Sequence, residues 1–231
     1  MNRPETTLFL LMSVDGKIST GAGDERDVDR DFPGIPGVCE GLGQYYDIEQ
    51  TTALWSSNTG RVMAKVGMNE RPLPKEKLPC SFVLLDNRPH LTAHGVAYLS
   101  AWLEWLVIVT ADPAHPAYGA AAPNVTVIGQ DPFDPAALFA QLYEAFGVRA
   151  LTVQSGGTVN ALLLRAGLID RVDVVVAPVL VGGEDTPSLI GGASVRTAAE
   201  LSQLRPLTLE SCEALAHSYL RLRYRVQNER R

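Results

Sequence analysis

Apolar runs without polar alternation recur along the chain, and polar turns separate them. The first run covers residues 6–14 (TTLFLLMSV), and others follow at 81–86 (SFVLLD), 106–110 (LVIVT), 124–129 (NVTVIG), 149–154 (RALTVQ) and 172–180 (VDVVVAPVL). Strands of a parallel sheet are buried on both faces and show this pattern. The runs therefore predict a mostly parallel sheet.

Segments with helical spacing lie between these predicted strands. Residues 91–105 (LTAHGVAYLSAWLEW) fit a helix, in which Trp102 and Trp105 would pack against the sheet. A second predicted helix begins at Asp134 and Pro135, as N-cap and first-turn proline, and ends at Gly147 as a C-terminal cap. The alternation of strand, helix and strand is typical of α/β proteins.

Two polar segments interrupt this order. Residues 39–55 predict a helix followed by a short strand, and residues 56–59 (SSNT) then offer several helix N-cap candidates. Residues 23–31 (GDERDVDRD) mix both charge signs and carry little apolar content, so we expect a solvated loop.

The C-terminal part has a different pattern. Residues 207–212 (LTLESC) and 218–226 (SYLRLRYRV) alternate apolar and polar positions, as antiparallel strands with one wet face do. We therefore predict an α/β fold with a mostly parallel central sheet, flanking helices and antiparallel C-terminal edge strands. No linker or low-complexity segment divides the 231 residues, so a single domain over residues 1–231 is expected.

Charge and cysteine usage exclude several classes of protein. The formal net charge of -6 argues against non-specific affinity for nucleic acid or an anionic membrane. Cys39, Cys80 and Cys212 have neither metal-pair nor redox-motif spacing, which fits a reducing cytoplasm. The apolar run near the N-terminus is too short to span a bilayer, so we expect a soluble protein that is not secreted.

The histidines do not predict a metal centre. His90, His94, His115 and His217 share no metal-ligand spacing, and although the first two stand four apart, no cysteine or acidic motif accompanies them. We interpret all four as surface residues.

A glycine pair marks the clearest candidate site. In residues 153–168 (VQSGGTVNALLLRAGL) a predicted strand runs into Gly156 and Gly157 and then into a helix. Glycine lets an anion approach the backbone, and the free N–H groups of a helix N-terminus would favour a pyrophosphate. A tight turn without any ligand explains a lone glycine pair equally well. The second pair, Gly182 and Gly183, ends the next strand and brings flexible backbone to the same rim.

Three motifs resemble one known family. Residues 153–183 (VQSGGTVNALLLRAGLIDRVDVVVAPVLVGG), 12–18 (MSVDGKI) and 220–226 (LRLRYRV) are similar, in the same order, to the RibD C-terminal family of NADPH-dependent reductases. That family includes the pyrimidine reductases of riboflavin biosynthesis and has the dihydrofolate reductase fold. The resemblance implies NADPH as cofactor and a homodimer, and it covers most of the chain.

The resemblance also implies roles for particular residues. Asp15 and Lys17 would lie beside the substrate, and Gln154 would orient its pyrimidine. Lys17 could anchor the substrate phosphate, as could Arg61, although a turn with a surface ion pair and a solvated helix residue remain alternatives. The predicted cofactor-binding residues, counting the second glycine pair, are Ser57, Thr59, Asn87, Gly156, Gly157, Thr158, Val159, Asn160, Gly182 and Gly183.

Two positions depart from the family pattern. Family members usually have Glu where this chain has Gln154, and an amide can hydrogen-bond a substrate but cannot act as a carboxylate. The family has Asp four residues after the helix-start Thr59, where this chain has Met63. Both departures bear on which substrate is used.

The sequence leaves three functions open. The first is an NADPH-dependent reductase of a phosphorylated ribosylaminopyrimidine, 5-amino-6-(5-phosphoribosylamino)uracil or its diamino precursor, with hydride transfer to C1 of the ribose and no catalytic side chain assigned. The second is an NADPH reductase of another heterocycle or carbonyl compound, and the third is a non-catalytic nucleotide-binding protein. The zinc-deaminase signature that often accompanies such reductases is missing from the sequence, so we expect only the reductase half.

Overall fold

The computed structural model describes residues 2–228, and the chain in it forms two compact units. Unit 1 contains Ala53–Ser155 together with the described residues 2–4. Unit 2 contains Glu5–Thr52 and the described residues 156–228. Each unit thus draws on segments that are distant in the sequence. The single domain expected over residues 1–231 stays a prediction.

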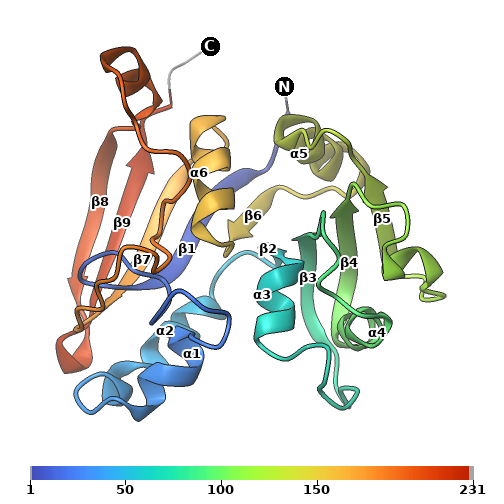
Figure 1. Cartoon of the computed structure of the whole chain (residues 1–231), viewed down its shortest axis with the longest axis horizontal. Coiled ribbons are helices and arrows are strands. Elements are labelled where there is room, and N and C mark those ends of the chain that lie inside the picture. Colours follow the sequence, from blue (N-terminus) through green and yellow to red (C-terminus); the bar gives the residue numbers. More distant parts are fainter. Residues whose placement is uncertain (1, 229–231) are drawn as a thin grey trace. The chain divides into compact units, whose positions relative to one another are not determined.

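Unit 1 is built on parallel strands in the order β5-β4-β3-β2-β6 (Figure 1). The strands are β2 (Trp55–Thr59), β3 (Leu78–Leu85), β4 (Leu103–Thr110), β5 (Val125–Gly129) and β6 (Ala150–Val153). The helices are α3 (Gly60–Lys65), α4 (Ala93–Trp102) and α5 (Pro135–Ala145), with a 3₁₀ turn, η3, at Pro116–Gly119. Because the strands are parallel, their carboxyl ends share one edge, where loops lead into helices.

Both faces of the unit 1 sheet are covered. Alternate residues of β3 and β4, such as Leu84 and Ile108, pack with Leu99 of α4 in one apolar cluster. On the opposite face Phe146, the C-cap residue of α5, makes edge contacts with the rings of Trp55 and Trp105. Burial of both faces explains the near-continuous apolar runs of these strands.

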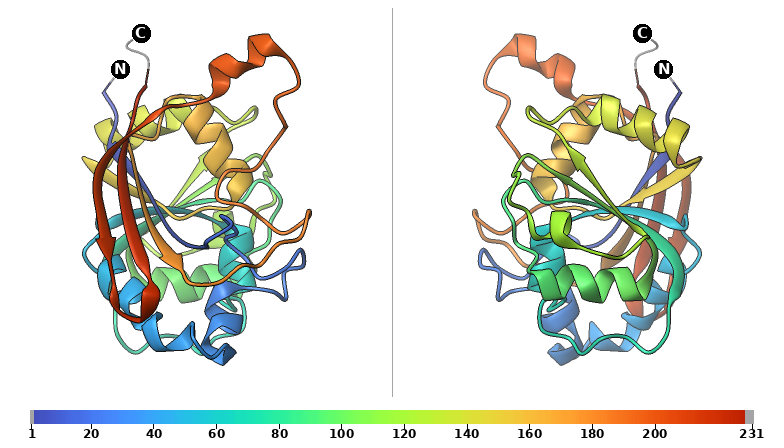
Figure 2. Two further views of the ribbon diagram at one scale, coloured as in Figure 1. Left: turned by 90° about the vertical axis from the view of Figure 1, so that its left-hand side faces the viewer. Right: turned by 90° about the vertical axis from the view of Figure 1, so that its right-hand side faces the viewer.

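Unit 2 combines a parallel pair with an antiparallel ribbon. Strand β1 (Glu5–Ser13) pairs in parallel with β7 (Arg171–Ala177), β7 pairs antiparallel with β9 (Leu220–Val226), and β9 pairs antiparallel with β8 (Leu207–Ala214). Figure 2 shows β8 and β9 side by side in red. The helices are α1 (Val28–Asp31), α2 (Gly43–Glu49) and α6 (Gly157–Arg165), and 3₁₀ turns are at Phe32–Gly34 (η1), Cys39–Gly41 (η2), Ala198–Gln203 (η4) and Ala216–Ser218 (η5).

An aromatic cluster forms part of the core of unit 2. The ring of Phe9 stacks on Tyr45, with ring centroids 5.1 Å apart. Tyr219 is fully buried, and its hydroxyl group donates to the carbonyl oxygen of Val38 at 2.7 Å. A Cβ atom at Gly41 would lie 2.5 Å from the Tyr219 ring, so only glycine fits there. The turns at residues 32–41 are thereby packed onto strands that enter from distant parts of the sequence.

The predicted fold class is confirmed: the strands are mostly parallel, and the C-terminal ones are antiparallel. The helix predicted at 91–105 ends at Trp102, because Leu103 begins β4; Trp105 therefore lies in a strand and does not belong to the helix. Residues 23–31 are not wholly a loop, since Asp27 caps the short helix α1. Within the described residues, no helix has the length and apolarity needed to cross a membrane.

Candidate active site

In unit 2, two loops leave the parallel pair of strands at the same edge. Ser13 at the end of β1 is in register with Ala177 at the end of β7. The turn at residues 13–18 and the loop at residues 178–192 follow directly, and Lys17 forms an antiparallel bridge with Ser188. Backbone hydrogen bonds from Ile18 to Pro187 and from Leu189 to Gly16 join them further.

Asp15 binds the backbone of the loop after β7. Its carboxylate accepts hydrogen bonds from the Val181 N–H at 3.0 Å, the Gly182 N–H at 2.6 Å and the Ser13 hydroxyl at 2.6 Å. The Ser13 hydroxyl has the largest effect, and together these donors lower the pKa of Asp15 from 3.8 to about 2. Asp15 is thus ionised at neutral pH and clamps this loop.

Lys17 holds the same loop from its other side. Its Nζ donates to the carbonyl oxygens of Gly183 at 2.8 Å and Thr186 at 3.0 Å. The structure therefore brings Asp15 and Lys17 together with Gly182 and Gly183, whose φ angles of 71° and 83° suit glycine. These contacts show that Asp15 and Lys17 hold the loop after β7 in place. The substrate roles predicted for the two residues stay predictions.

The two glycines that begin α6 have different surroundings. Gly156 is the N-cap residue, with extended backbone, and a Cβ atom added there would meet nothing within 4 Å. A Cβ atom on Gly157 would lie 2.2 Å from the Ser188 carbonyl oxygen, and the carbonyl oxygen of Gly157 accepts from the Gly191 N–H at 2.9 Å. Gly157 is required for packing, whereas Gly156 leaves open space at the helix N-terminus.

The next three residues of α6 also differ in exposure. Thr158 is exposed and Val159 is half-buried. Asn160 is fully buried, and its side-chain amide donates to the Leu189 carbonyl oxygen at 2.8 Å. Asn160 therefore ties α6 to the 178–192 loop, and the cofactor contact predicted for it stays a prediction.

In unit 1, Ser57, Thr59 and Gln154 lie within or directly after the neighbouring strands β2 and β6. Thr59 is the N-cap residue of α3, and its hydroxyl accepts from the Val62 N–H at 3.2 Å. Ser57 is buried inside β2, and its carbonyl oxygen accepts from the N–H of Gln154 at 2.8 Å. The Oε1 atom of Gln154 accepts from the Ser56 hydroxyl at 2.7 Å. Gln154 thus lies beside β2 and is anchored there by backbone and side chain.

Met63 and Asn87 have clear structural positions. Met63 is 6% exposed and belongs to the apolar cluster of α4, β3 and β4, so an ionised Asp at this position would lose its solvation. Asn87 follows β3 and is exposed, and its side-chain oxygen accepts from the Ala111 N–H at 3.1 Å. The cofactor role of Asn87 stays a prediction.

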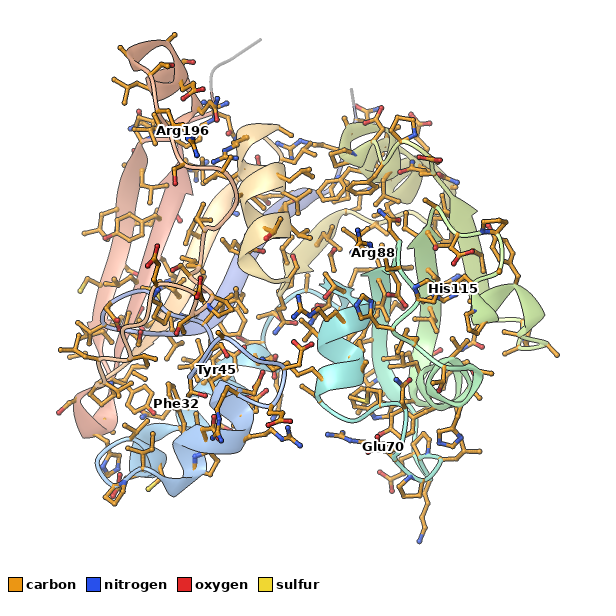
Figure 3. All side chains as sticks on the ribbon, viewed as in Figure 1. Phe32, Tyr45, Glu70, Arg88, His115 and Arg196 are labelled. Atoms are coloured by element: carbon orange, nitrogen blue, oxygen red, sulfur yellow. The ribbon has the colours of Figure 1, made fainter. Side chains whose placement is uncertain are left out.

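A buried acid with two histidines was missed by the sequence analysis. The Asp86 carboxylate, at the end of β3, contacts His90 Nδ1 at 2.9 Å and His115 Nε2 at 3.0 Å, and the side chains of Asp86 and His115 are both 0% exposed. His115 is labelled in Figure 3. The prediction that His115 is a surface residue is wrong, because burial beside a carboxylate satisfies its ring.

One signal for this cluster was present in the sequence. Asp86 ends a buried strand and His90 follows four residues later, within reach of the same turn. The third member, His115, is 29 residues from Asp86 and only the fold brings it in. Among residues 2–228, no group of three or more His, Cys, Asp or Glu side chains is arranged to hold a metal ion.

Comparison with known proteins identifies the family. The family described as RibD C-terminal domain matches residues 4–220 of the chain. The chain belongs to this family. The predicted resemblance is therefore confirmed over most of the sequence.

Named relatives are reductases. A 2,5-diamino-6-ribosylamino-4(3H)-pyrimidinone 5′-phosphate reductase of Methanothermobacter thermautotrophicus is 27% identical over 217 residues, which cover 87% of this chain and 90% of that protein. The reductase of the same name from Aquifex aeolicus is 33% identical over 82 residues, so that match spans only 36% of each chain.

Solved structures share the fold. A RibD structure from Acinetobacter baumannii has a TM-score of 0.68 at 16% identity, covering 98% of this chain and 59% of that one. Riboflavin biosynthesis reductase Rib7 of Saccharomyces cerevisiae has a TM-score of 0.60 at 14% identity, covering 97% of this chain and 90% of that one. The chain thus spans little more than half of the RibD protein and most of the yeast reductase.

Proposed function

We propose that this RibD C-terminal family protein is an NADPH-dependent reductase of a phosphorylated ribosylaminopyrimidine in riboflavin biosynthesis. The observation that carries the proposal is the open backbone of Gly156 at the start of α6, at the carboxyl end of β6. Family membership and relatives named as pyrimidinone phosphate reductases support the choice of reaction.

The start of α6 fits a pyrophosphate. The first N–H groups of a helix have no intrahelical partners and carry partial positive charge, so they bind anions. Gly156 leaves room for the anion, while Gly157 and Asn160 fix the helix to the 178–192 loop. In this proposal the residues from Gly156 to Asn160 bind the phosphates of NADPH, as the resemblance implies. The cofactor roles of Ser57, Thr59 and Asn87 stay predictions.

The protein contributes binding and orientation to the reaction. NADPH, when bound, supplies the hydride that is transferred to C1 of the ribose. Gln154, held by Ser56, orients the pyrimidine through its side-chain amide. The clamp made by Asp15 and Lys17 keeps the 178–192 loop in place, and alignment of substrate and cofactor accounts for much of the rate enhancement.

The direct test is turnover. Purified protein with NADPH and the phosphorylated ribosylaminopyrimidine should lose nicotinamide absorbance and form the ribityl product, as detected by mass spectrometry. No absorbance loss with either the diamino compound or its deaminated uracil form would refute the proposed reaction. Tight NADPH binding without turnover on a broad substrate panel would support a non-catalytic nucleotide-binding protein.

Substitution of Gln154 tests which compound accepts the hydride. If the substrate is the pyrimidine, we expect Gln154→Glu, which restores the residue usual in the family, to raise kcat/KM on it by about tenfold, since a charged acceptor makes a stronger hydrogen bond to the substrate. Gln154→Ala serves as the control for loss of the side chain. If neither Gln154→Glu nor Gln154→Ala changes kcat/KM, the substrate is another heterocycle or a carbonyl compound.

We further propose a single reductase domain that acts as a cytoplasmic homodimer. The exposed apolar side chains of Leu207, Leu209 and Leu220 on β8 and β9 support pairing of two copies. A light-scattering mass equal to one chain would contradict the homodimer.

A further inference from the structure

Strand β5 forms the outer edge of the unit 1 sheet. It is last in the order β5-β4-β3-β2-β6, and Figure 1 shows it as the outermost strand of unit 1. At one end the Leu106 N–H donates to the Asn124 carbonyl oxygen at 2.9 Å. At the other end the Gln130 N–H donates to the Thr110 carbonyl oxygen at 3.0 Å. Even-numbered residues of this segment therefore face β4, and the backbone groups of the odd-numbered residues point to the outer edge, because successive residues of a strand alternate in direction.

Most of the outward backbone groups of β5 are unpaired. The Val125 N–H turns back to the Ala122 carbonyl oxygen at 3.2 Å, in agreement with an outward direction for the odd-numbered residues. Among residues 2–228, the backbone N–H and carbonyl groups of Val127 and Gly129 have no hydrogen-bond partner. Such a row of free donors and acceptors is a template for another strand.

β5 also lacks the features that usually keep sheet edges from pairing. Natural edge strands are protected by charged residues, by proline or by bulges. Residues 113–130 contain no Asp, Glu, Lys or Arg, none of residues 125–129 is proline, and the register of β5 on β4 is regular. By contrast β8, the edge strand of unit 2, has a bulge and carries Glu210 and Glu213. The edge of β5 is therefore open to a partner strand.

A second copy of β5 fits this edge in the antiparallel orientation. In an antiparallel pair, two opposite residues whose backbone groups point toward each other exchange two hydrogen bonds. With Val127 on the two-fold axis, the two Val127 residues exchange such a pair. Gly129 then lies opposite Val125 of the other copy, and its N–H reaches that carbonyl oxygen. Neither copy gives up a bond that it already makes, since the Val125 N–H keeps Ala122.

The side chains along the edge suit the same arrangement. Val127 is half-buried, and the two-fold axis brings two β-branched side chains together. Gly129 is exposed and leaves room for Val125 of the second copy. Tyr118 lies next to this room, because a Cβ atom on Gly129 would be 3.3 Å from its hydroxyl oxygen, and Tyr118 is 52% exposed. Pairing would cover apolar surface that otherwise faces water.

We propose that β5 is a self-association edge, at which two copies of this chain join their unit 1 sheets through an antiparallel β5–β5 pair. The partner is a second copy because the edge is uncharged and complementary to itself. The inference is independent of the proposed reductase function. It also concerns a different strand from the β8 and β9 surface proposed for the homodimer, so a chain that makes both contacts assembles beyond two copies.

The mass of the full chain in solution tests this pairing. Val127→Lys places two like charges opposite each other on the axis and should abolish it, whereas Leu209→Lys should disrupt the contact through β8 and β9. By light scattering over a dilution series, we expect four or more chains for the unaltered protein, two for each single variant and one for the double variant. Ala97→Lys, which adds the same charge at an exposed position of α4, is the matched control and should keep the unaltered mass.

Hydrogen exchange reports on the edge itself. The N–H groups of Val127 and Gly129 exchange quickly when the edge is open and slowly when it is paired. We expect slow exchange in concentrated unaltered protein and in Leu209→Lys, and fast exchange in Val127→Lys. If Val127→Lys does not fold, as judged by its thermal melt, Gly129→Pro takes its place, because it removes one outward donor without adding a charge.

Each outcome decides for or against the pairing. Equal masses for the unaltered protein and Val127→Lys would refute it, as would fast exchange of both N–H groups in the concentrated unaltered protein. If Val127→Lys lowers the mass and Leu209→Lys does not, the β5 pair stands and the homodimer through β8 and β9 falls. None of these results bears on turnover, so the reductase function is tested separately.

Discussion

Gly156 and Gly157 are adjacent, yet the structure requires glycine at only one of them. A Cβ atom on Gly157 would meet the Ser188 backbone at 2.2 Å, whereas one on Gly156 would meet open space. The sequence predicted a glycine turn before a helix but could not divide these roles, because Ser188 approaches α6 only in the folded chain.

Substitution at these two positions should therefore affect different properties. We expect Gly157→Ala to lower the free energy of unfolding by about 1–3 kcal/mol, the usual cost of overpacking a tight contact. Gly156→Ala, the matched control, should unfold at nearly the same urea concentration as the unaltered protein. Equal urea midpoints for the two variants would contradict the packing role of Gly157.

The residues beside the first turn show a similar limit of sequence reasoning. Asp15 and Lys17 were predicted as substrate-side residues from the resemblance, and their positions in a turn were correct. Their partners are backbone groups of residues 181–186, more than 160 positions along the chain. No local pattern could indicate this clamp.

The sequence predicted the ends of those helices whose caps are formed by residues close in the sequence. Asp134 accepts from two N–H groups at the start of α5, and Gly147 has a φ of 67° after its end, as their sequence signals predicted. The sequence predicted that the strand ends at Trp55, because the polar residues 56–59 resemble helix N-caps. In the structure these residues belong to β2, and only Thr59 caps a helix. Burial of polar side chains inside a strand depends on neighbouring strands, which a local window does not contain.

The Asp15 carboxylate joins the turn at residues 13–18 to the 178–192 loop, and we expect its contribution to stability to be lost in acid. The folded pKa of Asp15 is about 2 and its ordinary value is 3.8, so the clamp stabilises the fold above pH 4 and is lost as the pH falls toward 2. We expect Asp15→Asn to reduce stability at pH 6 and to approach the unaltered protein at pH 2. Because Asp15 is exposed, solvent screening keeps the effect small.

Urea unfolding from pH 6 to pH 2 measures this effect. Ser13→Ala removes the hydroxyl that lowers the Asp15 pKa most and should weaken the same pH dependence. A stability difference between the unaltered protein and Asp15→Asn that stays constant down to pH 2 would argue against the clamp.

At the scale of the whole molecule, the fold class and family were accessible from the sequence because they depend on repeated patterns. Apolar runs predicted the parallel strands, alternation predicted β8 and β9, and three motifs predicted the family that matches residues 4–220. The division into two compact units was not foreseen, because each unit is assembled from separate segments without a linker. The Asp86 cluster was missed for the same reason, since it joins the end of β3 to a residue beyond β4.

The central claim is that Gly156 opens the start of α6 to the pyrophosphate of a nicotinamide nucleotide. The most direct test is a fluorescence titration of the purified protein and of Gly156→Val with NADPH and then NADH. We predict that the unaltered protein binds NADPH and that the variant, still folded by circular dichroism, does not. Equal NADPH binding by both proteins, or no binding by either, would contradict this claim and show that the glycine turn has only a structural role.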